Sequence, residues 1–232
     1  MNYLLPILAV FTGYLVALAF TPKNREFIKL FLAFSGAFLL SVTVFELLPH
    51  LFGHHVEHTE TQHRFDKYLG IWIMAGILLQ IFLEFFSKGA EHGHMHLNRE
   101  LNQFPWPLFL SLSLHAFLEG FPIADHDLLV YGIVIHKLPV AIILSAFFIQ
   151  SSISKWKTAV FLLLFSLMTP LGTLVAEHTE FIQPIYLELQ ALTIGIFLHV
   201  STVILFESSE GHKFNINKLL VIVLGVTMAY MM

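Results

Sequence analysis

The sequence contains no cysteine among its 232 residues. Disulfide bonds and thiolate metal sites are therefore excluded, and the redox state of the compartment is left open. Charge is scarce as well, since charged residues make up 12% of the chain, about half the fraction of a typical soluble domain. The net charge of −4 gives no reason to expect a nucleic acid as partner. This composition excludes a soluble domain.

Hydrophobic residues are abundant instead. They form 56% of the chain, and the mean hydropathy is +0.76. Most of the length must therefore lie in lipid, and we expect the chain to be embedded in a lipid bilayer. Histidine is also frequent, with 14 residues, and these side chains need an explanation.

The chain divides into eight apolar segments. A helix needs about 20 residues to cross a hydrocarbon layer about 30 Å thick. We therefore expect an all-α integral membrane protein with eight transmembrane helices in a single domain, residues 1–232. No Lys or Arg precedes Tyr3 and no small-residue cleavage pattern follows the first segment, so we expect a retained helix and no signal peptide. The expected spans are residues 3–21, 28–51, 68–87, 107–124, 128–150, 158–177, 184–206 and 216–232.

Positive charge is concentrated in alternate loops. The odd-numbered loops carry Lys23, Arg25, Lys29, Lys88, Arg99, Lys155, Lys157, Lys213 and Lys218, and the even-numbered loops carry Arg64 and Lys67. Because cytoplasmic loops hold the excess of Lys and Arg, we expect both termini outside the cytoplasm. The short loops favour a multi-pass protein of the plasma (inner) membrane.

Two spans resemble each other. Residues 36–46 read Gly-Ala-Phe-Leu, then Ser-Val-Thr-Val-Phe-Glu, and residues 195–207 read Gly-Ile-Phe-Leu, then Ser-Thr-Val-Ile-Leu-Phe-Glu. The two segments cross the membrane in opposite directions, which suggests an inverted repeat of the kind found in secondary transporters. Chance similarity between two apolar helices is the alternative.

Four polar residues lie within the fourth and fifth spans, residues 107–124 and 128–150. They are His115, Glu119, His136 and Lys137. The link between these spans is so short that they must form an antiparallel hairpin. His115 and His136 each lie about 15 Å from the turn at 1.5 Å per residue, which is the depth of the bilayer midplane.

Glu119 follows His115 by one helical turn, so the imidazole and the carboxylate share one helix face. His136 supplies a third ligand from the neighbouring span. Two imidazoles and a carboxylate suit zinc and similar first-row cations better than calcium or magnesium. The alternative is a buried polar network that only holds helices together.

These residues and their neighbours resemble the ZIP family of zinc and iron transporters. The fourth span carries a His-x-x-x-Glu-Gly pattern at residues 115–120, and the fifth carries a degenerate His-Glu-x-Pro-His-Glu pattern at residues 136–141. The segments 168–172, Met-Thr-Pro-Leu-Gly, and 46–49, Glu-Leu-Leu-Pro, are also similar to family segments. The resemblance extends over essentially the whole chain.

The resemblance implies a prokaryotic-type ZIP bundle in which the first, fourth, fifth and sixth helices move against the other four. It also implies a homodimer. Many relatives bind two adjacent metals, but the corresponding positions here are Ala116, Lys137 and Val140. We therefore expect the second metal site to be degenerate, with the Lys137 ammonium balancing Glu119 beside a single site. The alternative is that Lys137 permanently satisfies Glu119 and transport is poor.

Other polar residues have weaker assignments. Glu46, Thr169 and His199 are candidates for the transport path, with scaffold hydrogen bonds as the alternative. Loop histidines could capture metal ions or could be an ordinary solvated loop; these are His92, His94 and His96.

The expected function is transport of a divalent transition metal toward the cytoplasm by alternating access, without a resident cofactor. Zinc is the leading cargo, and Fe²⁺, Mn²⁺ and Cd²⁺ remain open because the same ligands accept them. We expect no enzyme activity. Two alternatives remain: an intramembrane zinc hydrolase with water at an open metal position, and a metal sensor of the same fold that does not transport.

Overall fold

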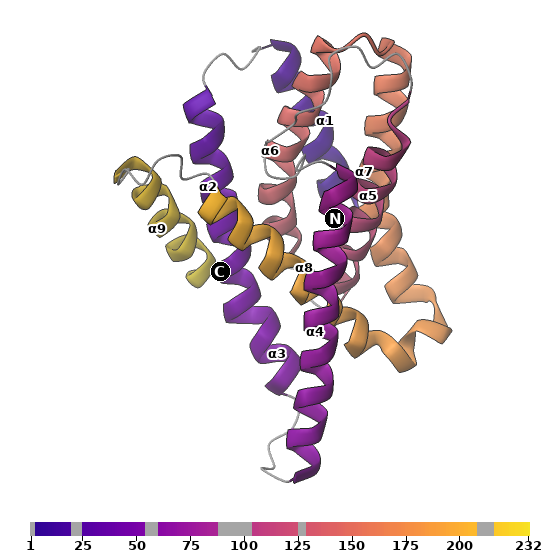
Figure 1. Ribbon diagram of the computed structural model, residues 1–232, viewed down its shortest axis with the longest axis vertical. Coiled ribbons are helices and arrows are strands. Elements are labelled where there is room, and N and C mark those ends of the chain that lie inside the picture. The colour runs from indigo at the N-terminus through magenta and orange to yellow at the C-terminus, as the bar shows by residue number, and fades with distance from the viewer. Residues whose placement is uncertain (1–2, 20–24, 54–59, 88–103, 125–128, 208–215) are drawn as a thin grey trace.

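A computed structural model describes residues 3–19, 25–53, 60–87, 104–124, 129–207 and 216–232. Secondary structure in these ranges is entirely helical (Figure 1). The elements are α1 (Leu4–Ala19), α2 (Arg25–Val42), η1 (Thr43–Leu47), α3 (Leu48–Gly53), α4 (Glu60–Ser87), α5 (Trp106–Leu118), η3 (Phe121–Ala124), α6 (Leu129–Gln150), α7 (Lys155–His178), η4 (Glu180–Ile185), α8 (Tyr186–Glu207) and α9 (Ile216–Tyr230).

The eight expected spans all correspond to apolar helical segments. Six are long enough to cross a bilayer, and α1 and α9 are shorter apolar helices. The second span is continuous from Glu26 to Gly53 but includes the π-helical turn η1, which the apolar pattern does not predict. The all-α membrane fold is thus confirmed, and the protein is multi-pass.

Two prolines lie inside long helices. Pro139 is within α6 and Pro170 is within α7, and both helices are continuous through them. Each proline removes one backbone donor, so a local loosening of the helix is expected at these points without a break in the helix.

The helices form two groups by the closeness of their packing. The first group, which we call the ligand group, contains α1, α5, α6 and α7. Within it, α5 and α7 touch backbone to backbone: a methyl group added at Gly172 would overlap the Phe117 carbonyl oxygen, and one at Gly120 would overlap that of Thr169. Phe109, Phe148 and Phe161 fill the interior, with ring centroids 4.7 Å apart between Phe148 and Phe161.

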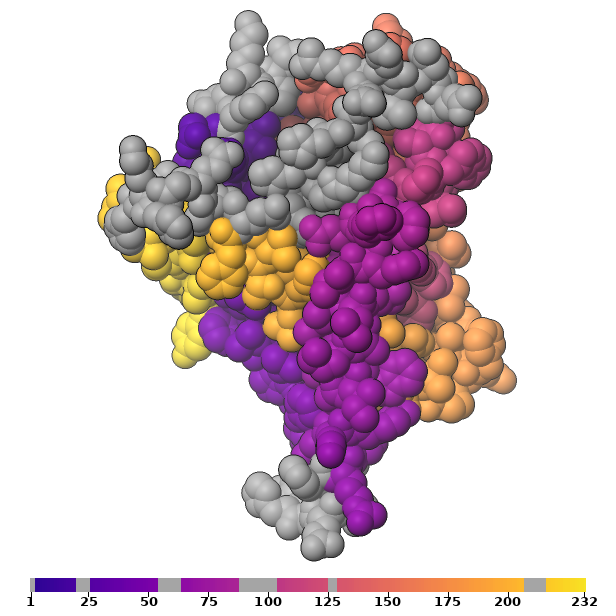
Figure 2. All heavy atoms as spheres, viewed as in Figure 1, coloured from indigo at the N-terminus to yellow at the C-terminus, as the bar shows by residue number. Residues whose placement is uncertain are grey.

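The second group, which we call the scaffold group, contains α2, α4, α8 and α9. A methyl group at Gly76 on α4 would overlap the Leu192 carbonyl oxygen, and one at Gly195 on α8 would overlap that of Ile73. In the space-filling view α4 lies across the face turned to the viewer, with α8 beside it (Figure 2). α9 packs on the outer side of α2 (Figure 1). The close glycine contacts therefore fix α4 rigidly to α8.

Candidate metal-transport site

The site is built around Glu119, directly after the last residue of α5. The helix ends here, and the chain turns at Gly120 into η3. The Glu119 side chain is buried, with 1% of its surface exposed, and a charge so deep in the bundle needs a compensating partner. Its nearest cation is Lys137, which donates from Nζ to Glu119 Oε1.

Thr169 on α7 completes this side of the carboxylate. Its Oγ1 accepts from Lys137 Nζ at 2.8 Å and lies 2.7 Å from Glu119 Oε1 and 2.9 Å from the Ala116 carbonyl oxygen. The hydroxyl has one proton, so it donates to one of these two oxygens at a time. Lys137 Nζ also lies 5.0 Å from the centroid of the Phe165 ring, within the range of a cation–π contact. The ammonium is thus held by three different groups.

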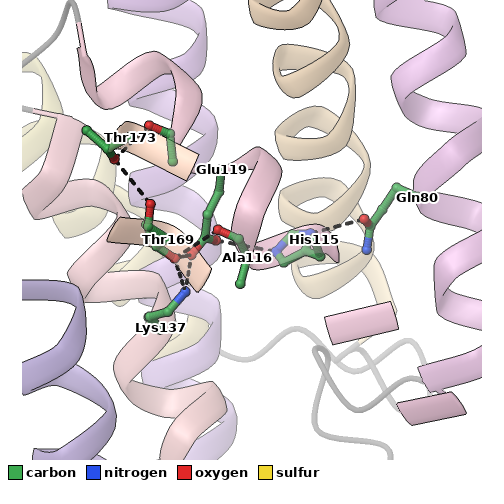
Figure 3. A network of polar contacts seen from close by, with 8 residues as sticks. Gln80, His115, Ala116, Glu119, Lys137, Thr169 and Thr173 are labelled. Atoms are coloured by element: carbon green, nitrogen blue, oxygen red, sulfur yellow. Dashed lines mark hydrogen bonds and ion pairs between the residues drawn. The ribbon is translucent and has the colours of Figure 1, made fainter. Parts of the chain in front are cut away.

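His115 faces the other carboxylate oxygen. Its Nε2 lies 3.5 Å from Glu119 Oε2, and its Nδ1 lies 3.0 Å from Oε1 of Gln80 on α4. Figure 3 shows Lys137 and Thr169 gathered on one side of Glu119, with His115 extending in the other direction toward Gln80. The carboxylate therefore separates an ammonium from an imidazole.

His136 on α6 lies beside His115. The centroids of the two rings are 6.3 Å apart, and the ring planes are inclined by 69°. Both side chains are buried. The structure thus brings His115, Glu119 and His136 into one buried region between α5 and α6.

These three side chains do not form a closed metal site in this conformation. Within the described ranges, no three His, Asp or Glu residues are grouped closely enough to hold one metal ion. In the same conformation the Lys137 ammonium holds one carboxylate oxygen of Glu119, and the other oxygen faces His115.

Comparison of the sequence with protein-family models identifies the family of this chain. The family model described as ZIP zinc transporter matches residues 91–232, more than half of the chain. The chain belongs to the ZIP family. A comparison with curated proteins gave no match.

Membership in the ZIP family implies transport of a divalent metal, with zinc as the type substrate. The family consists of transporters, so the chain is not an enzyme and the hydrolase alternative is set aside. The match contains His115, Glu119, His136 and Lys137, but it begins after α4. Gln80, which contacts His115, therefore lies outside the part of the chain that the family model recognises.

The remaining candidate residues of this ZIP protein lie elsewhere. Glu46 is in η1 with an exposed side chain, so it is not part of the buried group. His199 on α8 pairs with Glu84 on α4, with 2.8 Å between Nε2 and Oε2, and both side chains are partly exposed. This contact joins two helices of the scaffold group. The three loop histidines, His92, His94 and His96, lie outside the described residues.

Gln80 is the functional candidate that the sequence patterns missed. It is fully buried in α4. A polar residue inside an apolar span is a signal in itself, because an amide in hydrocarbon needs a hydrogen-bonding partner. Its partner could not be named without knowing which face of α4 meets α5.

Proposed function

We propose that this ZIP protein carries zinc or a similar divalent cation through a single site formed by His115, Glu119 and His136. The contact that supports this most directly is the 3.5 Å separation between His115 Nε2 and Glu119 Oε2 in a buried environment. Because Gln80 Oε1 can only accept, the proton of the neutral His115 ring belongs on Nδ1. A nitrogen lone pair then faces a carboxylate oxygen, and this arrangement favours a cation between them.

His136 is the third ligand in this proposal. Two imidazoles on one zinc ion, at Zn–N distances of about 2.0–2.1 Å, have ring centroids roughly 5 Å apart. The observed centroid separation between His115 and His136 is 6.3 Å. A shift of about 1 Å would thus complete the set, with water as the fourth ligand.

The position of Lys137 is the reason why we propose one bound metal ion and not two. Its ammonium provides one permanent positive charge at Glu119, where many relatives place a second ion. The buried pair is stabilised by Thr169 and by the Phe165 ring. Metal binding at Oε2 leaves the Lys137 contact at Oε1 in place, so the two cations share one carboxylate.

Transport requires the site to be exposed to the two sides in turn, and we propose that the ligand group moves against the scaffold group. Each of the close glycine–backbone contacts described above joins two segments of the same group. Between the groups, Gly132 on α6 approaches α2 less closely: a methyl group there would lie 3.6 Å from Phe38 Cε1, an ordinary van der Waals distance. Sliding at such a surface disturbs less packing than separating helices that touch at their backbones.

Zinc uptake into proteoliposomes tests the proposal. We expect uptake to collapse for His115→Ala and for His136→Ala, while His178→Ala, at the exposed end of α7, keeps wild-type uptake. Unchanged uptake in both site variants would end the proposal. The buried Lys137–Glu119 pair also favours a second candidate, a metal sensor that does not transport; zinc binding that depends on His115 without any flux would establish that function.

A further inference from the structure

One contact to the proposed metal ligands comes from the scaffold group. Gln80 on α4 accepts a hydrogen bond from His115 Nδ1 at 3.0 Å, and both side chains are buried. The partners of Glu119 described above, Lys137 and Thr169, belong to the ligand group. The His115–Gln80 bond therefore joins a ligand to the opposite group of helices.

The chemistry of this bond determines which nitrogen of His115 can bind metal. A neutral imidazole carries one proton, and the nitrogen without it is the ligand. An acceptor at Nδ1 holds the proton there and leaves Nε2, which faces Glu119, with its lone pair. Metal-binding histidines commonly donate their other nitrogen to an oxygen in this way, which fixes the tautomer and the ring orientation.

We propose that Gln80 is a positioning residue that fixes His115 as an Nε2 ligand and ties its orientation to the relative position of the two helix groups. This inference rests on the proposed function, since it assumes that His115 binds the cargo. Gln80 lies one turn after Gly76, where α4 touches α8 at the backbone. His115 lies five residues before Gly120, where the chain just past the end of α5 touches α7 in the same way. Each end of the hydrogen bond is thus anchored in a different rigid group.

Movement between the groups must lengthen or break this bond. His115 then loses the acceptor that orders its ring, and the metal loses a preorganised ligand. Removing such an outer partner weakens metal binding by about 10- to 100-fold in other proteins. The site would consequently bind the cation more tightly in the conformation seen here than in one where α5 has moved along α4, which promotes release after the movement.

The test compares Gln80→Leu, which removes the acceptor, with Gln80→Glu, which keeps one. The matched control is Gln190→Leu, which removes another buried amide from the scaffold group. We expect the zinc Kd of the purified protein to rise about 10- to 100-fold for Gln80→Leu. Gln80→Glu should restore binding to within a few-fold of wild type, and Gln190→Leu should leave the Kd unchanged. A wild-type Kd in folded Gln80→Leu would overturn the inference.

A second measurement determines the tautomer of His115 in the wild-type protein. In histidine labelled with ¹⁵N, the chemical shifts distinguish the two tautomers, and the signal of His115 is the one lost in His115→Gln. We expect the Nδ1–H tautomer in the metal-free wild type; the Nε2–H tautomer would overturn the inference. If His115→Ala and His136→Ala both bind zinc normally, the proposed function itself fails. If they lose zinc while Gln80→Leu keeps it, only the role of Gln80 fails.

Discussion

Lys137 on α6 and Glu119 at the end of α5 form an ion pair in the interior of the bundle, with 2% and 1% of their surfaces exposed. Removing one partner from such a pair leaves an uncompensated charge, which is far more costly than never having had the pair. The lysine therefore stabilises the metal-free protein, and its charge repels any cation bound at the other oxygen of the same carboxylate.

Replacing Lys137 should lower the stability of the metal-free protein and raise its affinity for zinc. In Lys137→Ala without metal, we expect a loss of about 3–5 kcal/mol in the free energy of unfolding, the usual cost of breaking a buried pair. Zinc binding should tighten by about tenfold or more, because unit charges 4 Å apart interact by about 4 kcal/mol at an effective dielectric constant of about 20. Thermal unfolding with and without zinc, together with the zinc Kd, measures both effects.

The control for this prediction is Lys155→Ala, which removes an exposed charge at the start of α7. It should change neither the melting temperature nor the Kd. The zinc stoichiometry of Lys137→Ala should stay at one, because Ala116 and Val140 offer no side-chain ligands for a second ion. Two ions per chain would show that Lys137 alone suppresses a second site, and an unchanged Kd would contradict the charge repulsion between lysine and metal.

The helices, and the shared helix face of His115 and Glu119, could be predicted from the sequence because both depend on local spacing. A run of about 20 apolar residues must span the bilayer, and His115 and Glu119 share a face because they are four residues apart. The role of Gln80 could not be predicted, since it depends on how α4 is rotated about its axis against α5. The π-helical turn η1 was missed for a related reason: one extra residue in a turn leaves no mark on an apolar sequence.

The backbone contact between α5 and α7 should be essential for the site. A methyl group at Gly172 overlaps the Phe117 carbonyl oxygen, so Gly172→Ala must push α5 away from α7. Overpacking of this kind costs about 1–3 kcal/mol or more. The shift would also separate Thr169 from Glu119, and we therefore expect both a lower melting temperature and reduced zinc uptake.

Gly70→Ala on α4 is the matched control, because a methyl group there meets no atom within 4 Å. Since alanine favours a helix more than glycine does, we expect wild-type uptake and an equal or slightly higher melting temperature. Equal behaviour of Gly172→Ala and Gly70→Ala in the two assays would show that close approach of α5 and α7 is not needed.

The orientation in the membrane can be tested directly because the chain has no cysteine, so each introduced thiol is unique. The excess of Lys and Arg predicts that the turn between α6 and α7 is cytoplasmic and that the turn between α7 and α8 is external. Ser152 and Glu180 are exposed residues in these two turns. In intact cells, a membrane-impermeant maleimide should label Glu180→Cys and leave Ser152→Cys unlabelled until the cells are opened. The reverse pattern would place the termini in the cytoplasm. Zinc that moves from the η4 side of the membrane to the opposite side would then leave the cell. The labelling pattern therefore decides which direction of zinc movement the transport assay must detect.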